Sequence, residues 1–182
     1  MPRPSDEAKL VGRAQKGDRA AMAEIYDRHH STIYRYIFYR VGDAPTAEDL
    51  TATVFVRVVE NIDGYQYRGR PLLSWLYTIA RNVVVDFHRR GAGQTTLPLD
   101  ESLTTGATDV EQAAERALTQ RSLAAALSHL TEDQRQVILL KFVEGMSNEE
   151  VSRVMGKTVG GIKSLQHRAL AALARVLGPG AS

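Results

Sequence analysis

One row of side chains between residues 71 and 90 combines chemical groups that suit nucleic acid better than water. Its members are spaced by three or four residues, so they share one face if the segment is a helix. They are Trp75, Thr78, Asn82, Asp86 and Arg89. An amide and a guanidinium can address base edges and phosphates, and an indole can stack on an unpaired base. The row is a candidate nucleic-acid face, although a solvated face of an ordinary bundle helix explains these residues alone equally well.

The residues around this row add rings and positive charge. Residues 63–70 read DGYQYRGR and contain Tyr65, Tyr67 and Arg68. From residue 62 to residue 90 there are five arginines, Arg81 and Arg90 among them, and two aspartates, so five minus two gives a local charge of +3. A basic aromatic loop can hold a base that has left the stack, although tyrosines beside a bundle more often only pack against it.

A second set of candidate contacts lies near the C-terminus. Thr131 with Gln134 and Ser147 with Glu150 form two capping boxes, which predict two helix starts, and Gly156 predicts a tight turn before a last, basic helix. A short helix, a glycine turn and a longer basic helix are typical of a helix-turn-helix. The residues placed to contact DNA are Lys157, Thr158, Gly160, Lys163, Ser164, Gln166, His167 and Arg168.

The apolar periodicity predicts an all-α chain that positions these side chains. The expected helices span about residues 6–15, 18–40, 46–62, 71–90, 109–130, 131–144, 147–155 and 159–177. The stripe expected to face inward in the helix from residue 71 is Leu72, Leu76, Ile79, Val83 and Phe87. The corresponding stripe in the last helix is Ile162, Leu165, Ala169, Leu173 and Val176.

Composition divides the chain into two small helical domains. Residues 91–108, GAGQTTLPLDESLTTGAT, are rich in Gly and Thr and show no helical period, which predicts a flexible linker. The expected domains are residues 1–90 and residues 109–182. The net charge of +2 is small because an acidic block at residues 43–61 offsets the basic blocks.

The helix expected from residue 46 carries two apolar rows. The row that faces the bundle is Leu50, Val54, Val58 and Ile62, whereas Ala52, Val56 and Val59 lie on a different side. The second row is either a docking face for a partner or the sign of a helix that is buried on two sides.

Several functions find no support in the sequence. The chain contains no cysteine, and therefore no disulfide, thiolate metal site or cysteine nucleophile. It shows no phosphate loop, nucleophile elbow or metal-spaced histidine pair, so we expect no catalytic residues, no cofactor and no metal. His29 is expected to be a core histidine. No apolar run of about 18 residues exists, so we expect a cytoplasmic protein without membrane insertion.

Three motifs in this order resemble the extracytoplasmic-function (ECF) class of bacterial sigma factors, the small two-domain initiation subunits of RNA polymerase. AEDLTATVFVRVVENI is similar to the segment by which that family docks on core polymerase, and SWLYTIARNVVVDFHRR is similar to its −10 element helix. The stretch LTEDQRQVILLKFVEGMSNEEVSRVMGKTVGGIKSLQHRAL is similar to its −35 helix-turn-helix. The resemblance covers nearly the whole chain.

The resemblance implies a set of partners and contacts. The partners are core polymerase (the clamp helices of the largest subunit and the flap of the second-largest), double-stranded and melted promoter DNA, and an anti-sigma factor. The implied core-binding residues are Glu48, Asp49, Ala52, Phe55, Val56 and Val59. The implied −10 contacts are Tyr65, Tyr67, Arg68, Trp75, Arg81, Asn82, Asp86, Arg89 and Arg90. Members often carry Gln and Glu where this chain has Ala52 and Thr53, so docking would rest on Asp49 and apolar packing.

Two other functions compete with this interpretation. The first is a transcription regulator whose helix-turn-helix works without the polymerase core, since residues 136–156 also resemble the output domain of response-regulator-type activators. The nucleic-acid row of residues 75–89 argues against it, because such a regulator has no need of a second DNA face. The second is an enzyme, for which the sequence offers little.

Overall fold

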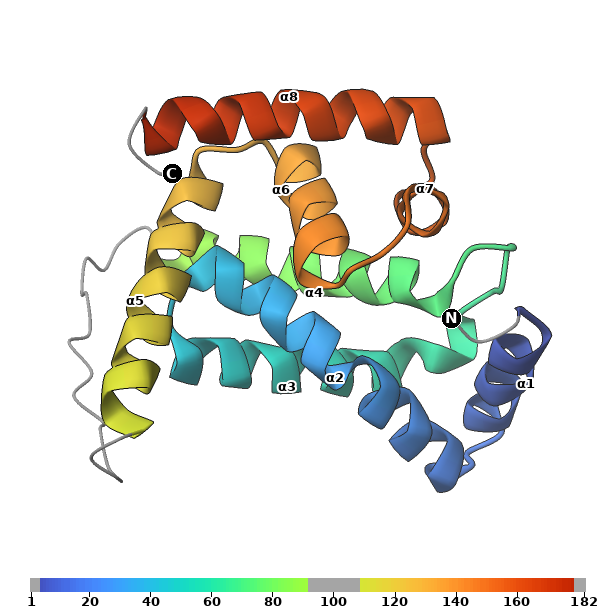
Figure 1. Ribbon diagram of the computed structural model, residues 1–182. Helices are drawn as coiled ribbons and strands as arrows, with labels where there is room; N and C mark the ends of the chain where they lie inside the picture. The colour runs from blue at the N-terminus through green and yellow to red at the C-terminus, as the bar shows by residue number, and fades with distance from the viewer. Residues whose placement is uncertain (1–3, 92–108, 179–182) are drawn as a thin grey trace.

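The computed structural model describes residues 4–91 and 109–178, and these residues form only helices, turns and loops (Figure 1). The N-terminal half contains α1 (Pro4–Gln15), α2 (Arg19–Val41), α3 (Ala44–Asn61), the 3-10 turn η1 (Ile62–Gly64) and α4 (Leu72–Gly91). The C-terminal half contains α5 (Asp109–Ser128), α6 (Glu132–Ile138), the π-helical segment η2 (Leu139–Val143), α7 (Asn148–Met155) and α8 (Val159–Leu177). The predicted all-α architecture of two helical domains is confirmed. The predicted linker lies outside the described residues.

The N-terminal domain is a bundle in which α2 packs against both α3 and α4, and α1 packs against the start of α2. Local signals set its helix starts. The Asp18 carboxylate accepts hydrogen bonds from Ala20 N and Ala21 N, and the Asp43 carboxylate accepts one from Thr46 N at 2.9 Å. Helix α3 therefore begins at Ala44, two residues earlier than predicted, with Asp43 rather than Thr46 at its boundary. Ile25, Ile33 and Ile37 of α2 are completely buried against this bundle.

The C-terminal domain begins its helices where the capping boxes predict. Thr131 caps α6 and Ser147 caps α7, with both reciprocal hydrogen bonds present in each case. The prediction of one regular helix up to residue 144 is wrong, because the backbone widens into η2 after Ile138. There Glu144 N donates to Leu139 O at 3.0 Å, a bond that spans five residues.

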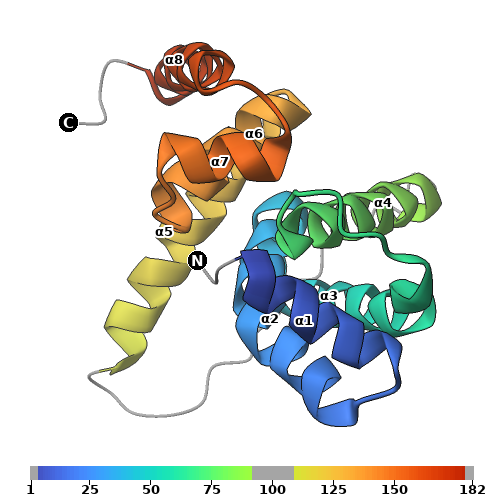
Figure 2. The same cartoon turned by 90° about the vertical axis from the view of Figure 1, so that its right-hand side faces the viewer.

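The two domains lie against each other, with α5 packed on α2 and α7 packed on α4 (Figure 2). Buried apolar residues of both domains belong to one continuous cluster, from Leu10 in α1 to Leu173 in α8. Helix α8 lies on the side of the C-terminal domain that faces away from α1 to α4. The arrangement leaves one long side of α8 open to solvent.

Two predicted inward positions are wrong. Phe87 near the end of α4 is exposed, and the buried face of that helix instead includes Leu73, Tyr77 and Val84. Val176 at the end of α8 is also exposed. Both residues lie near the C-terminal ends of their helices, and periodicity alone assigned them to the core.

Candidate nucleic-acid and partner interfaces

The polar row on α4 is mostly open to solvent. Thr78, Arg81 and Asn82 are exposed, as are Arg89 and Arg90 in the last turn. Among the residues that the structure describes, no side-chain hydrogen bond occupies Arg81 or Asn82. These two side chains are therefore available to a ligand that approaches this face.

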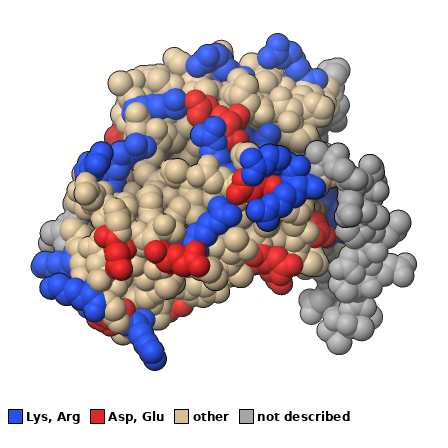
Figure 3. Space-filling model, turned by 180° about the vertical axis from the view of Figure 1, so that it is seen from behind, with Lys and Arg blue, Asp and Glu red and all other residues tan. Residues whose placement is uncertain are grey.

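Two charged members of the row bind each other. The Asp86 carboxylate accepts from Arg89 Nη2 at 3.1 Å and from Arg57 Nη2 of α3 at 3.3 Å. Asp86 therefore pairs with two cations, Arg89 from the row and Arg57 from α3. Figure 3 shows basic side chains at several places on this face of the molecule, among them the top, where α8 runs.

The loop before α4 presents its rings as a packed pair. The rings of Tyr65 and Trp75 lie 4.8 Å apart at an angle of 42°, and both are half-buried. Burial raises the pKa of the Tyr65 hydroxyl to about 12, and the nearby carboxyl of Glu7 acts in the same direction. A base that stacks on Trp75 would have to approach its remaining open edge or displace Tyr65. Arg68 is exposed and Tyr67 is half-buried.

Two side chains of α1 position this loop, and sequence reasoning missed both. Glu7 is buried and accepts from Leu72 N, the first residue of α4, at 3.0 Å. Gln15 donates from Nε2 to Ile62 O at 2.9 Å and to Tyr65 O at 2.8 Å. Pro71 was predicted as the first residue of this helix, but α4 begins at Leu72. The amide of Leu72 has no acceptor within the helix, and it donates to Glu7 instead. A buried acid on an amphipathic helix gives no sequence signal for a partner 65 residues away.

The helix-turn-helix is built by local contacts. Gly156 ends α7 in a left-handed conformation with φ 64°, which favours glycine. The Ser152 hydroxyl donates to Lys157 O at 2.5 Å and closes the turn. Thr158 then caps α8 by accepting from Gly161 N at 3.0 Å. A side chain at Gly161 would place its Cβ 3.1 Å from that capping hydroxyl, which is a tight contact, whereas Gly160 faces open space.

The predicted contacts of α8 lie together on its open side. Gly160, Lys163, Ser164, His167 and Arg168 are exposed and Gln166 is half-buried. Lys157 forms an ion pair with Asp133 of α6, with Nζ and Oδ2 2.9 Å apart, and Thr158 is engaged as the cap. Two of the three cations of α8, Lys163 and Arg168, are therefore exposed, whereas Lys157, before the helix, is paired with Asp133.

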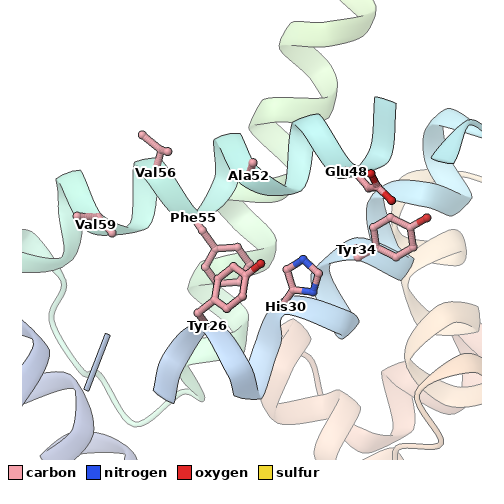
Figure 4. A pocket seen from close by; sticks show the side chains of 8 residues that line it. All are labelled: Tyr26, His30, Tyr34, Glu48, Ala52, Phe55, Val56 and Val59. Atoms are coloured by element: carbon pink, nitrogen blue, oxygen red, sulfur yellow. The ribbon is translucent and has the colours of Figure 1, made fainter. Parts of the chain in front are cut away.

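Five of the six predicted docking residues of α3, all except Asp49, line an open groove of about 830 Å³ between α2 and α3 (Figure 4). Val56 and Val59 are each 56% exposed, so the helix is not buried on two sides. Phe55 is buried and forms the floor of the groove. Its ring packs edge-on against Tyr26 of α2, with ring centres 4.8 Å apart. Glu48 lies at one end of the groove, and the neighbouring Asp49 is exposed.

Sequence reasoning missed the aromatic wall of this groove. Tyr26, His30 and Tyr34 of α2 line it opposite α3. The Tyr26 and His30 rings lie 4.7 Å apart, and the His30 and Tyr34 rings lie 6.5 Å apart. The signal was available, since three ring side chains recur every four residues beside the buried stripe of α2.

His29 packs at the edge of the core rather than among metal ligands. Burial lowers the pKa of its imidazole to about 4, and the charge of Arg28 contributes in the same direction. Across residues 4–91 and 109–178, no group of three or more His, Asp or Glu side chains could hold a metal ion. None of the helices described has the length and apolar character that crossing a membrane would require.

Comparisons with known proteins agree with this geometry. Residues 25–93 match the family description Sigma-70 region 2, and residues 120–173 match Sigma-70, region 4. The chain is 41% identical over 180 residues to the ECF RNA polymerase sigma factor BldN of Streptomyces coelicolor, which covers 95% of this chain and 67% of the relative. It is 32% identical over 167 residues to SigD of Mycobacterium tuberculosis, which covers 88% of this chain and 79% of the relative.

A solved structure shares the arrangement of the helices. The chain aligns with CnrH, solved in complex with the cytosolic domain of CnrY, with a TM-score of 0.69 and 23% identity over 96% of this chain and 99% of the other. At that identity the likeness shows the fold alone. The family descriptions and the relatives together show that the chain belongs to the ECF RNA polymerase sigma factors. The interpretation as a regulator that works without the polymerase is therefore set aside.

Proposed function

We propose that the chain acts in the cytoplasm as a promoter-specificity subunit, without catalysing a reaction itself. Its N-terminal domain docks on core RNA polymerase and captures unpaired bases of the −10 element, and its C-terminal domain reads the −35 element as duplex. The observation that carries the proposal is the presence of exposed basic side chains on two helices in two domains of one chain: Arg81, Arg89 and Arg90 on α4, and Lys163 and Arg168 on α8. A regulator with one DNA element needs only one such face.

The groove between α2 and α3 is the proposed docking site for core polymerase. Contiguous exposed apolar side chains mark protein interfaces, and here they are Ala52, Val56 and Val59 with the Tyr26 ring beside them. An open, elongated apolar groove between two helices suits a partner helix that inserts its apolar stripe. The clamp helices of the largest subunit have this form. Glu48 and Asp49 lie at one end of the groove, where they would pair with basic side chains of the partner.

The −10 element is the proposed ligand of the α4 row and its loop. Arg81, Arg89 and Arg90 provide the positive charge that holds phosphates, and Asn82 offers an amide to a base edge. Tyr65, Tyr67 and Trp75 provide ring surface for a base that has left the stack. Arg68 extends the positive charge on the loop.

The −35 element is the proposed ligand of α8. The open N-terminal turns of the helix and the close approach that Gly160 permits allow the backbone to lie near a phosphate. Gln166 and His167 lie where base edges can be reached, and Lys163 and Arg168 lie where phosphates can be held. The flap of the second-largest subunit is the proposed polymerase contact of this domain.

A protein inhibitor is a further proposed partner. CnrH was solved with the cytosolic domain of CnrY, and the sigma factor RpoE of Bartonella quintana was solved with the anti-sigma factor NepR. We extend this kind of partner to the present chain. An anti-sigma protein that covers the α2/α3 groove would compete directly with core polymerase.

Run-off transcription tests the proposed function. Core polymerase of Streptomyces coelicolor is incubated with a promoter library, with and without the chain, and the transcripts are sequenced. We expect a new, discrete class of start sites that depends on the chain. Unchanged start sites would contradict the proposal.

A matched pair of variants tests the docking site. Val56→Glu places a charge on the groove, whereas Val176→Glu places the same charge on an exposed valine of α8. We expect Val56→Glu to weaken binding to core polymerase by about tenfold or more, since it buries a charge in an apolar contact. Val176→Glu should bind core polymerase as the unchanged chain does. Equal effects of the two variants would show that the groove is not the docking site.

A further inference from the structure

A cavity of about 210 Å³ is lined by residues of α1, α2, the loop before α4, the start of α4, the segment before α7 and α7 itself. Among the proposed DNA and polymerase contacts, only Tyr67 lines it. The proposed function therefore leaves this cavity without a role. At about 30 Å³ per water, the cavity has room for roughly seven waters. That space suits a small ligand with about as many non-hydrogen atoms, or slightly more.

One part of the cavity is apolar. Leu73, in the first turn of α4, is 5% exposed, and Pro71 and Met146 are half-buried. The thioether of Met146 is flexible and polarisable, so it can adapt to an aliphatic or an aromatic group. A ligand that carries an apolar group of a few carbon atoms would remove that group from water here.

Two polar side chains of α2 line the cavity without offering it a charge. Burial lowers the pKa of the His29 imidazole to about 4, so this ring is neutral near pH 7. The Thr32 hydroxyl donates to the Glu144 carboxylate at 3.1 Å, and the same carboxylate accepts from Arg35 Nε at 2.7 Å. Thr32 is therefore already engaged, and the charges that a ligand would meet come from other residues.

Two guanidinium groups line the cavity, one from each domain. Arg28 of α2 and Arg153 of α7 are both exposed. Arg28 pairs with Glu24, one turn earlier on the same helix. Within the part of the chain that the structure describes, no hydrogen bond or ion pair occupies Arg153. A guanidinium presents paired N–H donors whose geometry matches a carboxylate or a phosphate, so Arg153 can bind an anionic group of a ligand.

A buried carboxylate lines the same cavity. Glu7 is 6% exposed, and its Oε2 accepts from Leu72 N at 3.0 Å. Among the residues described, this is the only hydrogen bond that Glu7 makes, and no ion pair joins it to Arg28 or Arg153. A carboxylate accepts hydrogen bonds on both of its oxygens, so Oε1 remains available. An ammonium group of a ligand would supply a donor and an opposite charge together.

We propose that this cavity binds a free α-amino acid with an apolar side chain, of the size of leucine. The ligand carboxylate binds Arg153 and Arg28, the ammonium group donates to Glu7 Oε1, and the side chain lies against Leu73 and Met146. Each of the three groups of an amino acid thus finds a complementary group in the cavity. The proposal goes beyond the proposed function, because it concerns the free chain and needs neither polymerase nor DNA.

Isothermal titration calorimetry on the full chain tests the ligand class with four probes. L-leucine carries all three groups, whereas 4-methylpentanoate lacks the ammonium, leucinol lacks the carboxylate and glycine lacks the apolar side chain. We expect L-leucine to bind with a Kd of roughly 0.1 to 1 mM, and the other three probes to bind at least about tenfold more weakly. No binding of L-leucine at about 10 mM would overturn the site. Binding of any other probe as tight as that of L-leucine would overturn the proposed ligand class.

Two variants assign the charged groups. Arg153→Gln should weaken binding of L-leucine by about tenfold and leave leucinol unchanged, because leucinol has no carboxylate for this side chain. Glu7→Gln keeps an acceptor for Leu72 N, and it should weaken L-leucine but not 4-methylpentanoate, which has no ammonium. Arg175→Gln removes a charge from an exposed position of α8 and should bind L-leucine as the unchanged chain does. Circular dichroism confirms that each variant remains helical. Unchanged affinity for L-leucine in Arg153→Gln and Glu7→Gln would overturn the assignment.

Methyl NMR locates the ligand. The methionine methyl groups are labelled with ¹³C, and Met146→Leu identifies the signal of Met146. We expect L-leucine to shift this signal and to leave that of Met22 in place, because Met22 packs against the core and does not line the cavity. Binding without a shift at Met146 would overturn the location. If the chain fails to direct transcription start sites, the proposed function fails, whereas these measurements on the free chain still decide the amino-acid site.

Discussion

The two proposed DNA-reading elements are positioned in different ways. The helix-turn-helix is set by contacts within a few residues, because Ser147 and Thr158 cap its helices and Ser152 closes its turn. The loop and start of α4 are instead held by α1, through Glu7 on Leu72 N and Gln15 on two loop carbonyls. An element that is positioned by local contacts keeps its conformation when residues elsewhere in the chain are substituted. An element that is held by distant side chains can change conformation when those side chains are substituted, even though no residue of the site itself is changed.

The strongest test of this contrast is removal of Glu7. Glu7→Ala leaves the buried amide of Leu72 without an acceptor and creates a cavity, so we expect a loss of about 3 kcal/mol in the free energy of unfolding. Glu7→Gln keeps an acceptor and should lose about 1 kcal/mol. Urea unfolding followed by circular dichroism measures both. Equal losses in the two variants would show that the hydrogen bond to α4 is unimportant.

The N-terminal domain should also lose stability in acid through His29. Its folded pKa of about 4 lies below the unfolded value of 6.5, so the unfolded state binds more protons between these values. The stability is present above pH 6.5 and is lost as the pH falls toward 4, by about 2 kcal/mol between pH 7.5 and pH 5. His29→Gln should remove most of that pH dependence. An unchanged pH profile in His29→Gln would contradict the assignment.

Asn82→Ala tests whether the α4 row reads DNA rather than supporting the fold. Asn82 is exposed, so its truncation creates no cavity, and the thermal midpoint should stay within about 1 °C. Loss of an amide contact should weaken opening at the −10 element by about 1.5 kcal/mol, or roughly tenfold. Permanganate footprinting of unpaired thymines measures the opening, and core binding serves as the control. A parallel loss of core affinity would assign Asn82 a structural role.

Ser147→Ala tests the local half of the contrast. Losing a capping box should cost about 1 kcal/mol, and the effect should remain within the C-terminal domain. Hydrogen exchange resolves the two domains, and we expect faster exchange in α7 with no change in α4. Faster exchange of the loop before α4 would show that the helix-turn-helix and this loop are coupled more tightly than their contacts indicate.

The smallest effects are expected within α8, where side chains differ in role. Lys163→Ala should weaken binding to all sequences and reduce the salt dependence by about one counterion-release unit. Gln166→Ala should instead change the preference at one position of the upstream element, at a cost of about 1 kcal/mol. Transcription from promoter libraries at several salt concentrations distinguishes the two. A changed preference at the downstream element would contradict the proposed division of the promoter between the domains.

The sequence by itself determined the helical class of the chain, two of its helix caps and most of the exposed faces. Apolar spacing, the two capping boxes and Gly156 act within one or two turns, so residues such as Ser147 and Val56 could be assigned from neighbours in the chain. The family could likewise be predicted, because its motifs are continuous segments.

Only the tertiary structure decided which distant groups meet. Glu7 and Leu72 are 65 residues apart, and Arg35 and Glu144 are 109 residues apart. No periodicity links such pairs, since each residue is an ordinary charged position on its own helix. Interactions between neighbours in the chain therefore determined the proposed DNA-binding surfaces. The packing of whole helices decided how these surfaces are held in place and which carboxylates join the two domains.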